Sequence, residues 1–312
     1  MTNKFADNRE KYLGFGESAA GLGCMLGPVL GSLFATNLGY CKAYLAFALL
    51  LAGAGVLSLI VLPGQAANEK LDLMSEEERA ESVKAAQQVP YSWFFASRRC
   101  LFALASCTVV CLMFSFSEPF FTPALKDEKG IPEAYQGLIM GASSVTFLGA
   151  TIFVGQVIGL LPKRVFMTIS FFCCVVGLFL LGPSWLLGLP NSVYILLGGQ
   201  ALLGAGMGFV FIPILPEMLD ALYAAKGITE GENERMDMII ADKAAGLYGA
   251  FYSVGMILSP IIGSLAYEFF EGYNDKRAFN KTCDLWAIGS LAFTLLYLCW
   301  NVLPDMRNLD SN

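Results

Sequence analysis

Four carboxylates lie within or beside long apolar stretches of the sequence, where a charge is costly: Glu17, Glu118, Glu217 and Asp220. A charged side chain at the centre of a bilayer costs about 2.5–3.5 kcal/mol on insertion scales, so such a residue is a candidate for function. A partly buried carboxyl has a raised pKa and can load and release a proton near neutral pH. Proton exchange and cation binding are therefore the chemistry that these side chains could carry.

Glu118 is the strongest of these candidates. In a helix it would share a face with Phe114, Ser115 and Phe121. Pro119 has no N–H to donate to the carbonyl of Ser115, so a polar backbone group is free at the same level. A carboxylate beside aromatic rings suits an organic cation, through charge and cation–π attraction. The alternative is that Glu118 lies hydrated near the outer end of its segment, with the phenylalanines facing lipid.

The other candidates each have a structural alternative. Glu17 could exchange protons, or it could form a hydrogen bond at the membrane interface or between two halves of the protein. Glu217 and Asp220 follow Pro216, and we expect them to end a helix there and to pair with cations of the connecting loops. Gln200 lies in a glycine-rich stretch and is as well placed to bridge helices as to contact a solute.

The composition places the chain in the membrane class. Of its 312 residues, 56% are hydrophobic and 15% are charged, against about 45–50% and about 25% in globular proteins. The net charge of −6 excludes a strongly basic nucleic-acid binder. The absence of histidine excludes ordinary zinc sites and Ser-His hydrolysis, and the cysteines lie mostly in apolar runs without a CxxC pair. We therefore expect no enzyme, no metal site and no cofactor.

Apolar stretches long enough to cross a bilayer, which takes about 20 helical residues, predict eight spans. They lie near 12–36, 42–62, 100–124, 135–160, 165–187, 192–216, 244–268 and 284–304. The segment 63–95 is polar and acidic and is interpreted as a solvated linker. The glycines Gly204, Gly206 and Gly208 follow no strand, so they do not form a dinucleotide-binding motif.

The distribution of basic residues predicts the orientation. Lysine and arginine are more numerous in the set of connections that includes both termini and the linker, which are therefore expected to be cytoplasmic. The single glycosylation sequon, Asn280-Lys281-Thr282, falls in a loop of the opposite set, where a glycan would be attached. Because such tripeptides arise often by chance, the sequon adds little to this interpretation.

Two spans carry the same glycine motif at a constant offset along the chain. The first is Gly23-x-x-x-Gly27-Pro28-x-x-Gly31, and the second is Gly255-x-x-x-Ser259-Pro260-x-x-Gly263. Small residues four apart let helices approach closely within a membrane. Five spans separate the copies, which indicates an internal duplication with a six-helix repeat. Two such parallel repeats joined by a linker are typical of one transporter architecture.

The first motif resembles the fifth-helix motif of proton-coupled antiporters in the major facilitator superfamily. The segments 13–28, 116–125 and 245–256 look most like its vesicular amine and polyamine transporter branch. The resemblance implies an all-α membrane fold, with residues 1–62 as the last two helices of the N-terminal half, 63–95 as a cytoplasmic linker and 96–312 as the C-terminal six-helix half. It also makes Asp220 a binding candidate, because an acidic residue has the same spacing from a proline in that branch.

The resemblance also shows two departures. The chain would hold family helices five to twelve, which is eight of twelve spans. The loop around Lys163 and Arg164 lacks the acidic residue that the family motif carries, which puts gating by that charge network in doubt.

Two functions follow from this interpretation. The first is proton-coupled antiport of a small organic solute, in particular a cationic one, by alternating access, with the glycine motifs packing the two halves together. The second is a transport-inactive subunit of a larger membrane complex, because the four missing helices would leave inner faces of the C-terminal half unpaired unless a partner covers them. Three explanations for the missing helices stay open: the sequence is truncated, another chain supplies them, or the protein has stopped transporting. The lipid bilayer, protons and the solute are the expected partners, with no nucleic acid.

Overall fold

The chain forms a bundle of long helices, and its computed structural model describes residues 23, 27, 30–31, 33–35, 37–61, 89–158, 161–272 and 277–304. The described residues contain no strand, which agrees with the predicted all-α fold. The helices are α2 (Tyr40–Val61), α5 (Ser92–Ala96), α6 (Arg98–Ser115), α7 (Glu118–Asp127), α8 (Glu133–Val157), α9 (Lys163–Leu181), α10 (Val193–Lys226), α11 (Glu234–Glu271) and α12 (Ala278–Tyr297), followed by a π-helix, Leu298–Val302.

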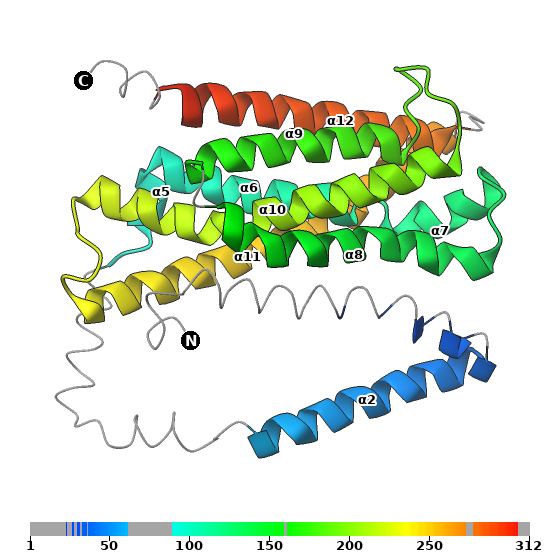
Figure 1. The fold of residues 1–312 in the computed structure, drawn as a ribbon, viewed down its shortest axis with the longest axis horizontal. Helices are drawn as coiled ribbons and strands as arrows, with labels where there is room; N and C mark the ends of the chain where they lie inside the picture. Colours follow the sequence, from blue (N-terminus) through cyan, green and yellow to red (C-terminus); the bar gives the residue numbers. More distant parts are fainter. Residues whose placement is uncertain are drawn as a thin grey trace.

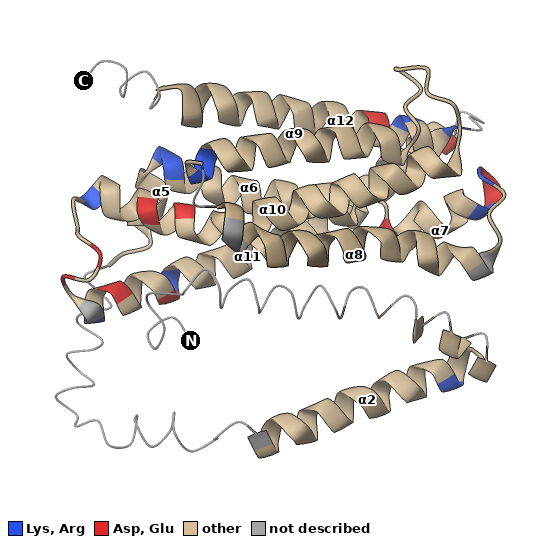
Figure 2. Ribbon diagram, in the orientation of Figure 1, with Lys and Arg blue, Asp and Glu red and all other residues tan. Residues whose placement is uncertain are grey.

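Seven candidate membrane spans occur among the described residues, with α6 and α7 counted as one span. They match seven of the eight predicted spans, while most of the first predicted span and of the linker lies outside the described residues. Among the described residues, the charged ones gather at the two ends of the bundle and leave its middle nearly free of charge (Figure 2). This distribution suits a bundle whose middle lies in the hydrocarbon core of a bilayer.

One predicted boundary is wrong. The sixth span was expected to end at Pro216, but α10 continues to Lys226, where Gly227 adopts a left-handed conformation (φ 63°) and ends the helix. Continued burial explains the difference, because Leu219 and Leu222 extend the packed face beyond the prolines. Since α11 begins at Glu234, the expected loop 217–243 shrinks to the short connection 227–233.

Close packing against α8 and α9 explains the glycines of α10. A methyl group at Gly204 would overlap the backbone of Ser143 in α8, and one at Gly199 would overlap the backbone at Leu181 in α9. Figure 1 shows α10 alongside both helices. Most of the buried side chains belong to the bundle from α6 to α12, whereas α2 lies apart and is largely exposed.

The second glycine motif packs within the bundle that contains it. A methyl group at Gly255 would lie 2.6 Å from Cys111 Cβ, and one at Gly263 would overlap the carbonyl oxygen of Phe116. Ser259 Oγ donates to the carbonyl of Leu112 at 2.9 Å. The motif of α11 therefore packs against α6. The expectation that the two glycine motifs pack the two halves together stays a prediction, because most of the first motif's span lies outside the described residues. A methyl group at Gly23 or Gly27 would meet no atom outside its own helical turn within 4 Å among the described residues.

We expect Gly263→Ala to lower the stability of the bundle and Gly246→Ala, on the same helix, to raise or preserve it. Overpacking typically costs about 1–3 kcal/mol, whereas alanine in an open helical site gains about 1 kcal/mol over glycine. Nothing lies within 4 Å of a methyl group at Gly246. Unfolding midpoints of the two variants in detergent test the difference, and equal midpoints would contradict the close contact between α11 and α6.

Candidate functional site

Glu118 lies at a break between two helices. The backbone leaves the helix at Phe116 and Ser117, α7 begins at Glu118, and Pro119 occupies the first turn. This break agrees with the expectation that Pro119 would interrupt the hydrogen-bonding pattern. The Ser115 hydroxyl donates to the Glu118 carboxylate, with Oγ and Oε1 3.0 Å apart. The carboxylate therefore has a hydrogen-bond partner at the break, and the residue as a whole is exposed.

The predicted neighbours of Glu118 are only partly brought together. Ser115 is in contact, and its Oγ also lies 3.3 Å from Met256 Sδ of α11. Phe114 is half-buried. Phe121 is buried in the core against the ring of Phe279, at 5.7 Å between centroids, so it does not form an aromatic wall for a solute. The break explains this, because residues on either side of it no longer share one helical face.

A pocket of about 760 Å³ opens next to this break, between α7 and α11. Phe120 and Tyr267 stack beside it, with their rings 4.6 Å apart and nearly parallel. Its described lining holds four carboxylates and no lysine or arginine: Pro119, Phe120, Pro123, Asp127, Glu128, Ser264, Tyr267, Glu268, Glu271 and Ala278. Negative charge that is concentrated in a hollow attracts cations. Because the lining comes from α7 and its end, from α11 and from the start of α12, no local motif could have indicated it.

Glu128, just after α7, forms hydrogen bonds to both α11 and α12. Its Oε1 accepts hydrogen bonds from the Tyr267 hydroxyl and from the backbone N–H of Phe279, both at 3.1 Å. Burial raises the pKa of Glu128 above its usual range, and these two hydrogen bonds only partly oppose that effect. Glu128 is thus a proton-binding candidate that the sequence did not reveal, because it lies just beyond the apolar span.

The sequon is a structural element. Asn280 is 2% exposed, its side-chain amide donates to the carbonyl of Pro183 at 2.9 Å, and its Oδ1 accepts from Lys129 Nζ at 2.6 Å. Lys129 also contacts Asn191, and burial lowers the pKa of Lys129. An asparagine with these buried contacts has no room for a glycan. The sequon therefore gives no support to the expected orientation.

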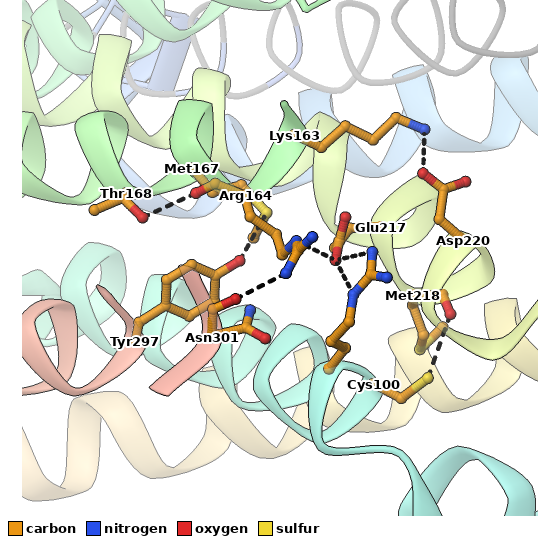
Figure 3. Close-up of polar contacts among 11 residues, drawn as sticks. Cys100, Lys163, Arg164, Met167, Thr168, Glu217, Met218, Asp220, Tyr297 and Asn301 are labelled. Atoms are coloured by element: carbon orange, nitrogen blue, oxygen red, sulfur yellow. Dashed lines mark hydrogen bonds and ion pairs between the residues drawn. The ribbon is translucent and has the colours of Figure 1, made fainter. Parts of the chain in front are cut away.

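The opposite end of the bundle holds a second cluster of charges, the Glu217 cluster: Arg99, Lys163, Arg164, Glu217 and Asp220. Figure 3 labels the last four of these residues. Arg99 donates through Nε and Nη2 to Glu217 Oε1, at 3.0 and 2.8 Å. Arg164 Nε lies 3.4 Å from the same oxygen, and Lys163 Nζ lies 2.9 Å from Asp220 Oδ2. One buried carboxylate thus faces two guanidinium groups.

The Glu217 cluster joins four elements. Arg99 comes from α6, Lys163 and Arg164 come from the start of α9, and Glu217 comes from α10. Arg164 Nη1 also donates to the carbonyl of Asn301, in the π-helix, at 2.8 Å. The acidic partner absent from the loop before α9 is therefore supplied by α10, which the motif comparison could not show.

The other residues that the sequence predicted as candidates have different outcomes. Pairing of Glu217 and Asp220 with nearby cations agrees with their structural interpretation, although neither ends a helix. Asp220 as a binding residue remains a prediction. Gln200 is buried on α10 beside Gly199, a position that suits contact between helices. Glu17 lies outside the described residues.

Comparison with known proteins points to one family. A family model described as Major Facilitator Superfamily matches residues 1–227. MFS-type transporter SLC18B1 of Rattus norvegicus is 24% identical over 314 residues, covering 100% of this chain and 63% of that protein. The Homo sapiens protein of the same name is 24% identical over 305 residues, covering 96% and 60%. The chain thus spans less than two thirds of the length of these curated relatives.

A structural comparison gives a weaker match. The crystal structure of a bacterial homologue of iron transporter ferroportin in the outward-facing state aligns with a TM-score of 0.47 and 18% identity. The alignment covers 64% of this chain and 44% of that one.

Proposed function

The chain belongs to the Major Facilitator Superfamily, and from this premise we propose that it works in proton-coupled antiport of a small organic cation by alternating access. It is a multi-pass membrane protein with seven described candidate spans. In this superfamily fold, solute and coupling-ion sites lie between two halves that rock about them. We further propose that residues 1–62 complete an N-terminal half, that 63–95 link the halves on the cytoplasmic side with both termini, and that 96–312 form the C-terminal half.

The observation that carries this proposal is the position of Glu118. Its carboxylate accepts a hydrogen bond from Ser115 at a break within a membrane span, and the residue is exposed. Helix breaks free backbone carbonyls, which add to the negative potential at the same level. An organic cation can pair with the carboxylate, and a proton can replace the cation there. Exchange of one for the other on a single group is the simplest basis for antiport.

The acid-lined pocket supports a cationic solute. It opens beside Pro119 and Phe120, the residues that follow Glu118, and offers four carboxylates and a stacked aromatic pair. Such a surface raises the local concentration of cations and disfavours anions. Glu128 adds a carboxyl whose pKa is raised by burial, so it binds a proton more readily than an exposed glutamate does.

Gradient-driven uptake tests the function. The protein, together with any sequence or partner that naturally accompanies this chain, is reconstituted in liposomes with an acidic interior and presented with labelled organic monoamines and polyamines. We expect the labelled cations to accumulate inside the liposomes and a protonophore to abolish this accumulation. Neutral analogues should not accumulate. Failure of every cation to accumulate under a verified gradient would contradict the proposal. We expect no enzymatic turnover of the solute.

A transport-inactive subunit of a larger complex is the second candidate. The observation that favours it is the exposed apolar surface of α2 and α11. Only 6% of the residues in the most apolar stretch of α2, and 17% of those in the most apolar stretch of α11, are buried. Such faces can pack against further helices as well as against lipid. Native electrophoresis in mild detergent distinguishes the two: a stable assembly with other proteins and no uptake would favour the subunit, and gradient-driven uptake by the isolated protein would exclude it.

A further inference from the structure

The connection between α9 and α10, residues 182–192, presents an apolar tip. Trp185, Leu186 and Leu187 are 51%, 54% and 62% exposed at successive positions. Gly188 follows them with a φ of 64°, in the left-handed region that favours glycine and turns the chain back. Contact of three adjacent large apolar side chains with water is unfavourable, so this tip needs an apolar environment.

A buried carboxylate holds the tip in place. Asp284 of α12 is 3% exposed, and its Oδ2 accepts hydrogen bonds from the backbone N–H groups of Trp185 and Leu186, at 3.0 and 3.2 Å. Ser184 Oγ accepts from the N–H of Leu187 at 3.2 Å. The conformation that exposes the apolar side chains is thus built into the fold, and its ordering entropy is already lost before the tip meets a partner.

The neighbouring helices place the tip at the surface of a membrane. At 1.5 Å per residue, the 19 residues of α9 are about 28 Å long, close to the hydrocarbon thickness of a bilayer. The connection therefore begins where the hydrocarbon ends. Figure 1 shows it projecting sideways from the bundle, across the helix axes. Such a projection would reach over the lipids that surround the bundle. Tyr194, in the first turn of α10, is also exposed near this level.

We propose that this tip is a preformed anchor seated in the interface of the bilayer. Trp185 would lie among the headgroups, where its amphipathic ring is favoured, and Leu186 and Leu187 would reach the outer part of the acyl chains. Lys281 Nζ lies 5.0 Å from the centroid of the Trp185 ring, which puts a cation at the level of the lipid phosphates. The role of Asp284 is to hold the backbone of the anchor, and it is independent of the solute.

Fluorescence quenching in vesicles tests this anchor. Trp93, Trp286 and Trp300 are changed to phenylalanine, which leaves Trp185 as the only tryptophan of the four. The protein is reconstituted in phosphatidylcholine carrying bromine near the headgroup end or near the methyl end of its acyl chains. A complementary Trp185→Phe variant, which keeps the other three, gives the signal that does not come from the tip.

We expect shallow bromines to quench Trp185 at least about twofold more than deep ones, and aqueous iodide to quench it weakly, as for an interfacial indole. Strong iodide quenching without bromolipid quenching would show a tip in water and overturn the proposal. Protection from both quenchers would show a protein partner on the tip and would also overturn it. In the same background, Asp284→Ala is expected to reduce the contrast between shallow and deep bromines by releasing the backbone. An unchanged contrast would overturn the assigned role of Asp284.

Discussion

Replacing Glu118 by glutamine is expected to reduce gradient-driven uptake of the organic cation by about tenfold to a hundredfold. Glutamine keeps the size of the side chain and can still accept a hydrogen bond from Ser115, whose Oγ lies 3.0 Å from the carboxylate. It loses the charge that pairs with a cation and the group that takes up a proton. Hydrogen bonds to charged groups contribute about 1.5–3 kcal/mol, and each 1.4 kcal/mol is a tenfold change in binding.

The matched control is Glu232→Gln. Glu232 is an exposed carboxylate in the connection between α10 and α11, far along the chain from the helix break, so its loss should leave uptake unchanged. Initial rates over a range of cation concentrations separate weaker binding from slower exchange. Uptake by Glu118→Gln that equals that of the control would remove Glu118 from the mechanism and return it to the alternative of a hydrated residue at the end of a span.

The parts of the structure that depend on local sequence could be predicted. Apolar length indicated the spans, and the missing N–H of Pro119 indicated a disturbance at Ser115, which the break at Phe116 and Ser117 bears out. The prolines of α10 misled the prediction of its end. Proline removes one hydrogen bond and kinks a helix, but packing on both sides of it can keep the helix continuous, as the burial of Leu219 and Leu222 shows.

The features that depend on distant contacts could not be predicted. Glu128 and Tyr267 meet in the acid-lined pocket although 139 positions separate them, and each alone looks like an ordinary residue near a span end. Asn280 matched a glycosylation signal, yet its side-chain amide donates a hydrogen bond to the buried carbonyl of Pro183. Local patterns indicate which residues lie at the ends of the spans. Only the packing of the helices decides which of these residues contact one another.

Replacing Glu217 by glutamine is expected to destabilise the bundle by about 3 kcal/mol. Breaking a buried ion pair by removing one partner typically costs about 3–5 kcal/mol, because the remaining charge stays buried without compensation. The side chain of Glu217 is 3% exposed and faces both Arg99 and Arg164. Those guanidinium groups are 24% and 17% exposed and can turn toward water, which places the expected cost at the lower end of the range. Unfolding midpoints in detergent measure it.

The neighbouring pair provides the control, because its carboxylate is more exposed and faces one cation, Lys163, where Glu217 faces two. The side chain of Asp220 is 44% exposed and pairs with Lys163 at 2.9 Å. Exposed ion pairs contribute about 0–1 kcal/mol, so Asp220→Asn should change stability several times less than Glu217→Gln does. If both variants lose the same stability, desolvation is not what makes Glu217 important, and the four elements that its cluster joins are held by apolar packing alone. A large difference would identify Glu217 as the residue that binds α6 and α9 to α10 at this end.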